Sequence, residues 1–138
     1  MVKNGYEEIK DKNGVLIAFV IFNSFQGEKY NFPTPEDSPL QVGINFYKEG
    51  DSVKAHFHNV HKRVIEKTQE FVLVANGQVK FTVYSEENEV LREIELVTGE
   101  VIFFASGGHR WDFIGDTKII EVKQGPYVSV EKDKTLID

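Results

Sequence analysis

The chain has 138 residues, no cysteine and a net charge of −6, from 16 basic and 22 acidic side chains. This length predicts a single domain over residues 1–138, and the lack of cysteine excludes disulfides, thiolate zinc sites and a cysteine nucleophile. The acidic balance argues against a nucleic-acid partner or a polybasic membrane surface. The longest apolar run, residues 15–22, is too short to span a membrane, and we expect a cytoplasmic protein because the first eight residues lack an apolar signal region.

Short segments rich in Val, Ile, Phe, Tyr and Thr alternate with turn-forming residues along almost the whole chain, which predicts an all-β protein. No helical periodicity of useful length is present. Asn76-Gly77 lies between two apolar runs and predicts a hairpin. The expected strands cover residues 15–23, 40–48, 52–58, 69–75, 78–84, 90–96, 100–104, 110–114, 117–123 and 127–130. Many short strands at regular spacing indicate a sandwich or a barrel.

The first expected strand is apolar without alternation over residues 15–22, so we expect both of its faces to be covered. In a small all-β domain, the second cover is either another segment of the same chain or a second subunit. The second choice predicts a homodimer, and both remain open at this point.

All four histidines fall in two short places, which is typical of a site. His56 and His58 are two residues apart on an expected strand, so their side chains share one face. Glu70 lies near the start of the next expected strand, and His109 follows a glycine turn much later in the chain. Three imidazoles and a carboxylate suit one divalent transition metal ion (Fe, Mn, Ni, Zn or Cu) and do not suit calcium.

The spacing of these residues resembles the two sequence motifs of the cupin family over residues 50–113. The matching residues are Gly50, His56, His58, Glu70 and Gly77, and then Gly99, Gly107 and His109. The resemblance implies a single cupin barrel, a jelly-roll-like double-stranded β-helix, with His56, His58, Glu70 and His109 as the metal ligands. The chain also resembles a group of small single-domain cupins, through Thr68-Gln69-Glu70, Gly107-Gly108-His109 and residues 121–127, and these cupins often accompany the biosynthesis of surface polysaccharides.

The chain departs from the cupin pattern at several positions. Eleven residues separate His58 from Glu70 where the family has three or four, and Ala105 and Phe113 replace the usual proline and asparagine. The inserted residues leave open whether Glu70 or His61 completes the metal site.

Other polar and aromatic residues are candidates for contacts to a small-molecule ligand. Basic side chains in the insertion would attract an anionic substrate, unless they are merely solvated. Trp111 shares the face of His109 and is either a pocket wall or part of the core. The candidates are Arg63, Lys67, Gln69, Tyr47, Trp111 and Gln124.

The donor set and the resemblance predict a metal-dependent enzyme for a small oxygen-rich or anionic substrate, such as a sugar derivative or an organic acid. An isomerase, an epimerase or an oxygenase fits, with His61 and Glu70 as candidate catalytic residues. The alternative is a binding module that holds a carbohydrate or another small molecule at the same metal site without turnover. A metal-free barrel is a third reading.

Overall fold

The computed structural model describes residues 4–137, and its regular secondary structure is almost entirely antiparallel β-strand, as the sequence predicts. The elements in chain order are β1 (Tyr6–Lys10), β2 (Leu16–Ile21), β3 (Tyr30–Asn31), β4 (Ile44–Asn45), β5 (Glu70–Asn76), β6 (Gln78–Tyr84), β7 (Val90–Val97), β8 (Val101–Phe104), β9 (Gly108–Phe113), β10 (Lys118–Lys123) and the short helix α1 (Val130–Asp133). No helix within residues 4–137 has the length and apolar character needed to cross a membrane.

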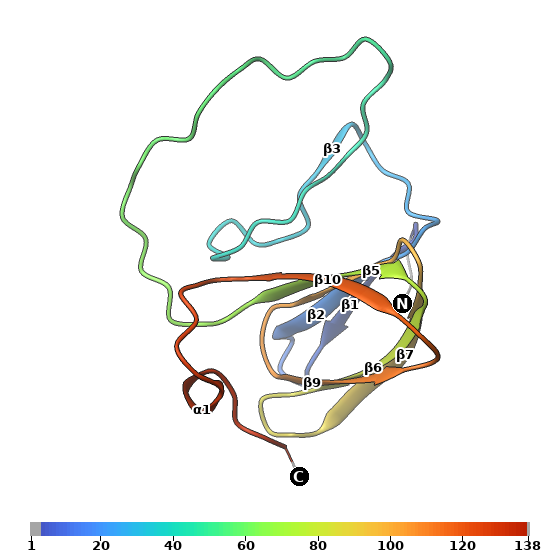
Figure 1. The fold of residues 1–138 in the computed structure, drawn as a ribbon, viewed down its shortest axis with the longest axis vertical. Coiled ribbons are helices and arrows are strands. Elements are labelled where there is room, and N and C mark those ends of the chain that lie inside the picture. The colour runs from blue at the N-terminus through green and yellow to red at the C-terminus, as the bar shows by residue number, and fades with distance from the viewer. Residues whose placement is uncertain (1–3, 138) are drawn as a thin grey trace.

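Two sheets face each other and form the body of the molecule (Figure 1). The larger sheet has the strand order β1-β2-β8-β5-β10, and the smaller has the order β7-β6-β9. A separate two-stranded ribbon pairs β3 with β4. Across the described residues, no strand joins β9 to β10, so the sheets do not close into a barrel.

The main core lies between the two sheets. Val72 and Ile102 of the larger sheet and Val79, Phe81 and Val83 of the smaller sheet are fully buried there. The Phe81 ring lies 6.0 Å from the Phe104 ring across the interface and 5.8 Å from Trp111. Phe81 therefore ties the two sheets together.

Both faces of β2 are buried, as its unbroken apolar sequence predicts. Ile17 and Val20 belong to the core between the sheets, whereas Phe19 and Ile21 belong to a second cluster on the outer face of the larger sheet. Side chains from the segment that carries β3 and β4 cover this outer face, among them Phe25, Leu40, Val42 and Ile44. The second cover is therefore the chain itself, and β2 is no longer an argument for a second subunit.

Three expected strands are wrong or much reduced. Residues 52–58 contain no strand, the expected strand over residues 40–48 shrinks to β4, and residues 127–130 lead into α1. The short strands β1 and β3 were not expected, because charged and aromatic residues interrupt their apolar pattern. By contrast, β6 has the expected bounds, and the other predicted strands differ by a few residues at their ends.

Asn76-Gly77 does not form the expected hairpin. It connects β5 to β6, but β5 pairs with β8 and β10, whereas β6 pairs with β7 and β9. Gly77 has a φ of 113°, and a Cβ at this position would lie 2.8 Å from the Asp116 carbonyl oxygen. This glycine therefore makes a corner between the sheets, which a residue with a side chain would crowd.

Replacing Phe81 with alanine should lower the free energy of unfolding by about 3–5 kcal/mol, because it opens a cavity between the sheets. Denaturant unfolding measures this loss. The control Val90→Ala removes a side chain that is 59% exposed and should change stability by less than about 0.5 kcal/mol. Equal effects of the two substitutions would contradict the assignment of the core.

Candidate functional site

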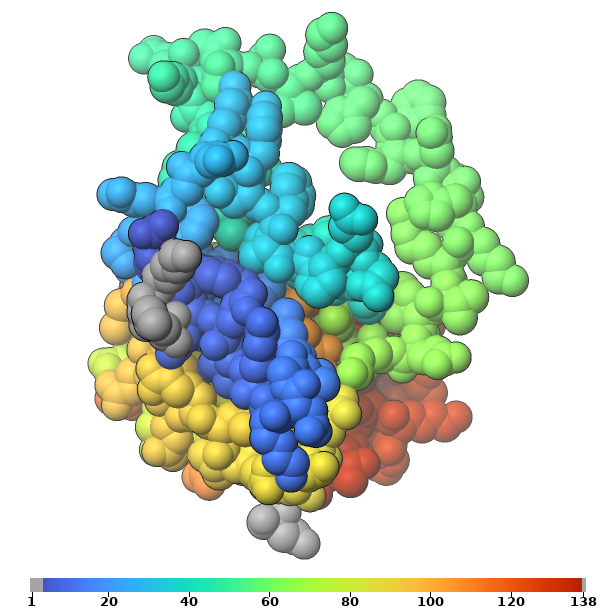
Figure 2. All heavy atoms as spheres, turned by 180° about the vertical axis from the view of Figure 1, so that it is seen from behind, coloured from blue at the N-terminus to red at the C-terminus, as the bar shows by residue number. Residues whose placement is uncertain are grey.

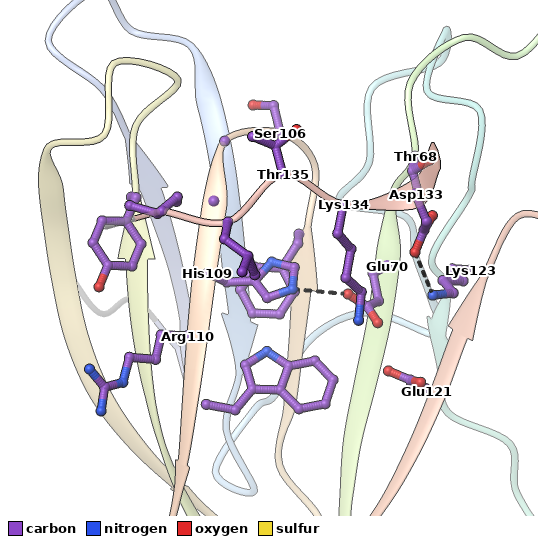
Figure 3. A pocket seen from close by; sticks show the side chains of 17 residues that line it. Thr68, Glu70, Ser106, His109, Arg110, Glu121, Lys123, Asp133, Lys134 and Thr135 are labelled. Atoms are coloured by element: carbon purple, nitrogen blue, oxygen red, sulfur yellow. Dashed lines mark hydrogen bonds and ion pairs between the residues drawn. The ribbon is translucent and has the colours of Figure 1, made fainter. Parts of the chain in front are cut away.

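A pocket of about 790 Å³ lies at the open side between the two sheets (Figure 3). Its walls come from the beginning of β5, from β9 and β10, and from the C-terminal residues 133–137. The ionisable side chains that line it from β5, β9 and β10 include Glu70, His109, Glu121 and Lys123. These residues are far apart in sequence, and the pairing of the strands brings them together.

Glu70 and His109 are in direct contact in this pocket. His109 Nε2 lies 3.2 Å from Glu70 Oε2, and the contact joins β9 of one sheet to β5 of the other (Figure 3). The Glu70 side chain is only 11% exposed, and that of His109 is 31% exposed. The structure therefore brings together two of the four expected ligands, Glu70 and His109, despite the insertion before Glu70.

A second carboxylate sets the charge around this pair. Burial raises the pKa of Glu70, but hydrogen bonds to His109 and Glu121 outweigh burial, so its pKa lies below the ordinary value. The pKa of Glu121 is raised, mainly because its side chain shares that hydrogen bond with Glu70. Glu70 is therefore the carboxylate that stays ionised, and Glu121 is the one that holds a proton more readily.

Aromatic rings fix the orientation of His109. Its imidazole stacks on Phe104 at a centroid distance of 4.1 Å and on Trp111 at 5.7 Å. Trp111 shares the face of His109, as predicted, and it both lines the pocket and packs against the core. The Trp111 Nε1 atom is buried and has no hydrogen-bond partner among the described residues.

His56, His58 and His61 lie outside this pocket, in a segment of residues 52–68 that we call the arm. The arm contains no strand or helix and all of its residues are exposed. It arches away from the two sheets and leaves open space beneath it (Figure 2). His56 and His58 remain neighbours, with ring centroids 5.2 Å apart, but the structure does not bring them to Glu70 and His109.

His56 is held in one tautomer by the arm itself. Its Nδ1 lies 2.8 Å from the Lys54 carbonyl oxygen. A carbonyl only accepts hydrogen bonds, so in the neutral imidazole Nδ1 carries the proton and Nε2 has the free lone pair. Histidines that bind metals usually have this arrangement.

The remaining ligand-contact candidates lie away from the pocket. Arg63 and Lys67 are exposed on the arm, and Lys67 Nζ lies 3.0 Å from Glu86 Oε1. Tyr47 is half exposed and packs edge-on against Tyr30. Gln124 accepts a hydrogen bond of 2.8 Å from the backbone N–H of Gln69, so its contact is with the backbone at the start of β5.

Gln69 is a structural clamp and does not line the pocket. Its Oε1 accepts hydrogen bonds from Ser38 Oγ at 2.7 Å and from the Leu40 N–H at 3.1 Å, and its Nε2 donates to the Ala105 carbonyl at 3.3 Å. These bonds fix the end of the arm and the start of β5. As a polar residue on an otherwise apolar strand, Gln69 was expected to contact a ligand. A buried side chain whose polar groups are paired with other residues explains its polarity equally well.

Sequence reasoning missed the contribution of β10 and of the C-terminus. In the antiparallel ladder, Lys123 lies opposite Glu70 on β5, and Glu121 is two residues away on the same face. Lys123 Nζ also lies 3.1 Å from Asp133 Oδ2, which holds the C-terminal segment over the pocket (Figure 3). The sequence predicted a strand over residues 117–123, but not the strand that it pairs with.

Within the described part of the chain, no three His, Cys, Asp or Glu residues are grouped closely enough to hold a metal ion. Searches of protein-family models, curated proteins and solved structures found no match to this chain.

Replacing Gln69 with alanine should lower the free energy of unfolding by about 1–3 kcal/mol, because it leaves buried donors and an acceptor unpaired. Thermal or denaturant unfolding measures the loss, with the exposed Gln26→Ala as the control. An unchanged stability would show that Gln69 is not a clamp.

Proposed function

We propose that the protein is a cupin-type metalloprotein whose ion is held by Glu70 and His109 on the body and by His56 and His58 on the arm. The observation that carries this proposal is the contact of 3.2 Å between Glu70 and His109 inside the pocket. A buried, ionised carboxylate beside an oriented imidazole is a normal pair of ligands for a divalent transition metal.

The donor set fits such an ion only if the arm contributes. Glu70 and His109 are two ligands, and a stable centre with room for a substrate needs at least three from the protein. His56 and His58 supply neighbouring imidazoles, and the bond from His56 Nδ1 to Lys54 leaves the Nε2 lone pair free. His61, on the same arm, is the alternative ligand or a contact to the substrate.

The pocket favours a small oxygen-rich or anionic molecule. Lys134 lines it from the C-terminal segment, and Lys123 faces it from β10. The Trp111 ring lines the same pocket. When bound, the ion would act as a Lewis acid or would activate oxygen, which suits an isomerase, an epimerase or an oxygenase.

A binding module without turnover is the second candidate for the same residues. The observation that favours it concerns Lys123: its hydrogen bond to Asp133 raises its pKa, so Lys123 stays charged and would bind an anion without exchanging a proton with it. Recovery of a bound sugar unchanged after long incubation with the metal-loaded protein would support this candidate. Conversion of the sugar would support the enzyme.

The metal content of the purified protein tests the site. Wild-type protein loaded with zinc and then desalted should retain about one ion per chain. The double variant His56→Ala/His109→Ala should retain only background zinc, because it removes one ligand from the arm and one from the body. Elemental analysis by mass spectrometry measures both.

The matched control is Arg63→Ala, which changes a charged residue of the arm that the proposal does not use as a ligand. This variant should keep the wild-type zinc content. If wild-type protein holds no more zinc than the double variant, the proposed metal site is lost.

A further inference from the structure

The C-terminal segment crosses the open side between the two sheets. Its residues 133–137, which we call the strap, line the pocket (Figure 3). At one end, Asp133 Oδ2 lies 3.1 Å from Lys123 Nζ on β10, the edge strand of the larger sheet. At the other end, the Ile137 side chain lies against Gly108, the first residue of β9, at the edge of the smaller sheet. The strap therefore bridges two edge strands that no strand among residues 4–137 joins.

The length of the strap suits this crossing. Packed sheets lie about 10 Å apart, and an extended segment of this length spans about 14 Å. A segment that is fixed to both sheets and extends between them covers the opening through which a ligand enters the pocket.

Gly108 gives the strap room to lie on β9. A Cβ at residue 108 would collide with Ile137 Cδ1, whereas the atom nearest to it from the sheet, Tyr84 Cβ, would be 3.5 Å away at an ordinary packing distance. Ile137 is 39% exposed, and the neighbouring Leu136 is 88% exposed. Of these two apolar side chains, Ile137 is therefore the one that packs on the body.

Charge also favours the position of the strap over the pocket. The Lys134 side chain extends from the strap into the pocket (Figure 3). There it is close enough to Glu121 for the two charges to interact. A positive charge near the carboxylates of Glu70 and Glu121 attracts the strap to the body by Coulomb interaction.

The strap is nevertheless attached weakly enough to open. Among the described residues, its one hydrogen bond to the strands is the contact of Lys123 with Asp133. The preceding helix α1 has no buried residue. Segments with few buried contacts open at a lower free energy than the core does, so the strap can leave the pocket while the sheets stay folded.

From these observations we propose that the strap is a lid over the pocket, held by Asp133 at β10 and by Ile137 at β9, which opens to admit an ion or a ligand. The position of the lid follows from its own contacts, whereas its control of access to Glu70 and His109 rests on the proposed function. Lids of this kind exclude water from a site and set the rates of entry and release.

A reversible disulfide tests where the strap lies, because the natural chain has no cysteine. A Cβ at residue 108 would be 3.8 Å from Ile137 Cγ1, so the double variant Gly108→Cys/Ile137→Cys brings two Cβ atoms within reach of a disulfide. Mild oxidation of the monomeric protein should give an internal disulfide. Peptide mass spectrometry identifies this bond, and a reductant removes it.

The matched control is Phe113→Cys/Ile137→Cys, which keeps the cysteine of the strap and moves its partner to the far end of β9. Phe113 is 54% exposed, so a cysteine at this position is open to reaction. The control should form little internal disulfide. Equal formation in the two variants would show a loose C-terminal segment and would overturn the lid.

A second measurement leaves β9 unchanged. Trp111 is the single tryptophan of the chain and lines the pocket, so quenching of its fluorescence by acrylamide reports on opening. Asp133→Ala should raise the quenching constant by about two- to fivefold, the change in an equilibrium that one exposed ion pair controls. Glu131→Ala is the control, because it removes the same charge from an exposed position of α1 outside the pocket. Equal quenching in the two variants would also overturn the lid.

Release of zinc tests whether the lid controls access to the site. Zinc-loaded Gly108→Cys/Ile137→Cys, mixed with an excess of a chelator, should release its ion more slowly when oxidised than after reduction. The single variant Ile137→Cys should release zinc at the same rate under both conditions. Equal rates for the oxidised and reduced double variant would overturn the control of access.

Failure of the lid and failure of the proposed function are distinguishable. If wild-type protein retains no zinc but the disulfide between residues 108 and 137 forms selectively, the proposed function fails and the position of the lid stands. If wild-type protein retains zinc but this disulfide forms no more than in the control, the lid fails and the proposed function stands.

Discussion

Phe104 connects the core of the protein to its candidate site. Its ring lies between Phe81 and His109, at centroid distances of 6.0 and 4.1 Å, and its backbone lies opposite Glu70 in the pairing of β5 with β8. The packing of the two sheets therefore decides how far Glu70 and His109 are apart. Because protein interiors are close-packed, a shift of one sheet against the other would be felt directly at the site.

The arrangement of the sheets explains why the pocket is open on one side. The order β1-β2-β8-β5-β10 leaves β10 at one edge, and the order β7-β6-β9 leaves β9 at another. Glu70 and Lys123 come from the first sheet, and His109 and Trp111 come from the second. Ligands or segments that enter here meet carboxylate, imidazole and indole groups together.

Local sequence patterns predicted the strands well and their pairing poorly. The alternation of residues 78–84 gave the bounds of β6, but Asn76-Gly77 has the same local signal whether it makes a hairpin or a corner between sheets. The apolar sequence of β2 indicated that both of its faces are covered, but not by which residues. Leu40 and Val42 of the same chain help to cover the outer face. Gln69 shows the same limit, because its partners Ser38 and Ala105 are distant in sequence.

The arm shows most clearly that local sequence patterns do not identify the partner of a strand. The alternation of Val53, Ala55 and Phe57 with His56 and His58 predicted a strand over residues 52–58, and this segment is without a ladder in the single chain. A strand needs a neighbour for its backbone hydrogen bonds, and local pattern does not name that neighbour. Spacing and residue type predicted that Glu70 and His109 come together, and the structure places them in contact, whereas Glu121 came to their side only through the pairing of β10 with β5.

The most direct test of the account is an anomalous difference map, recorded at the zinc absorption edge, from crystals grown with zinc. We expect one peak per chain within bonding distance of Glu70 Oε2 and His109 Nε2, with the two imidazoles of residues 56 and 58 as the other protein ligands. A map without a peak between Glu70 and His109 would contradict the account.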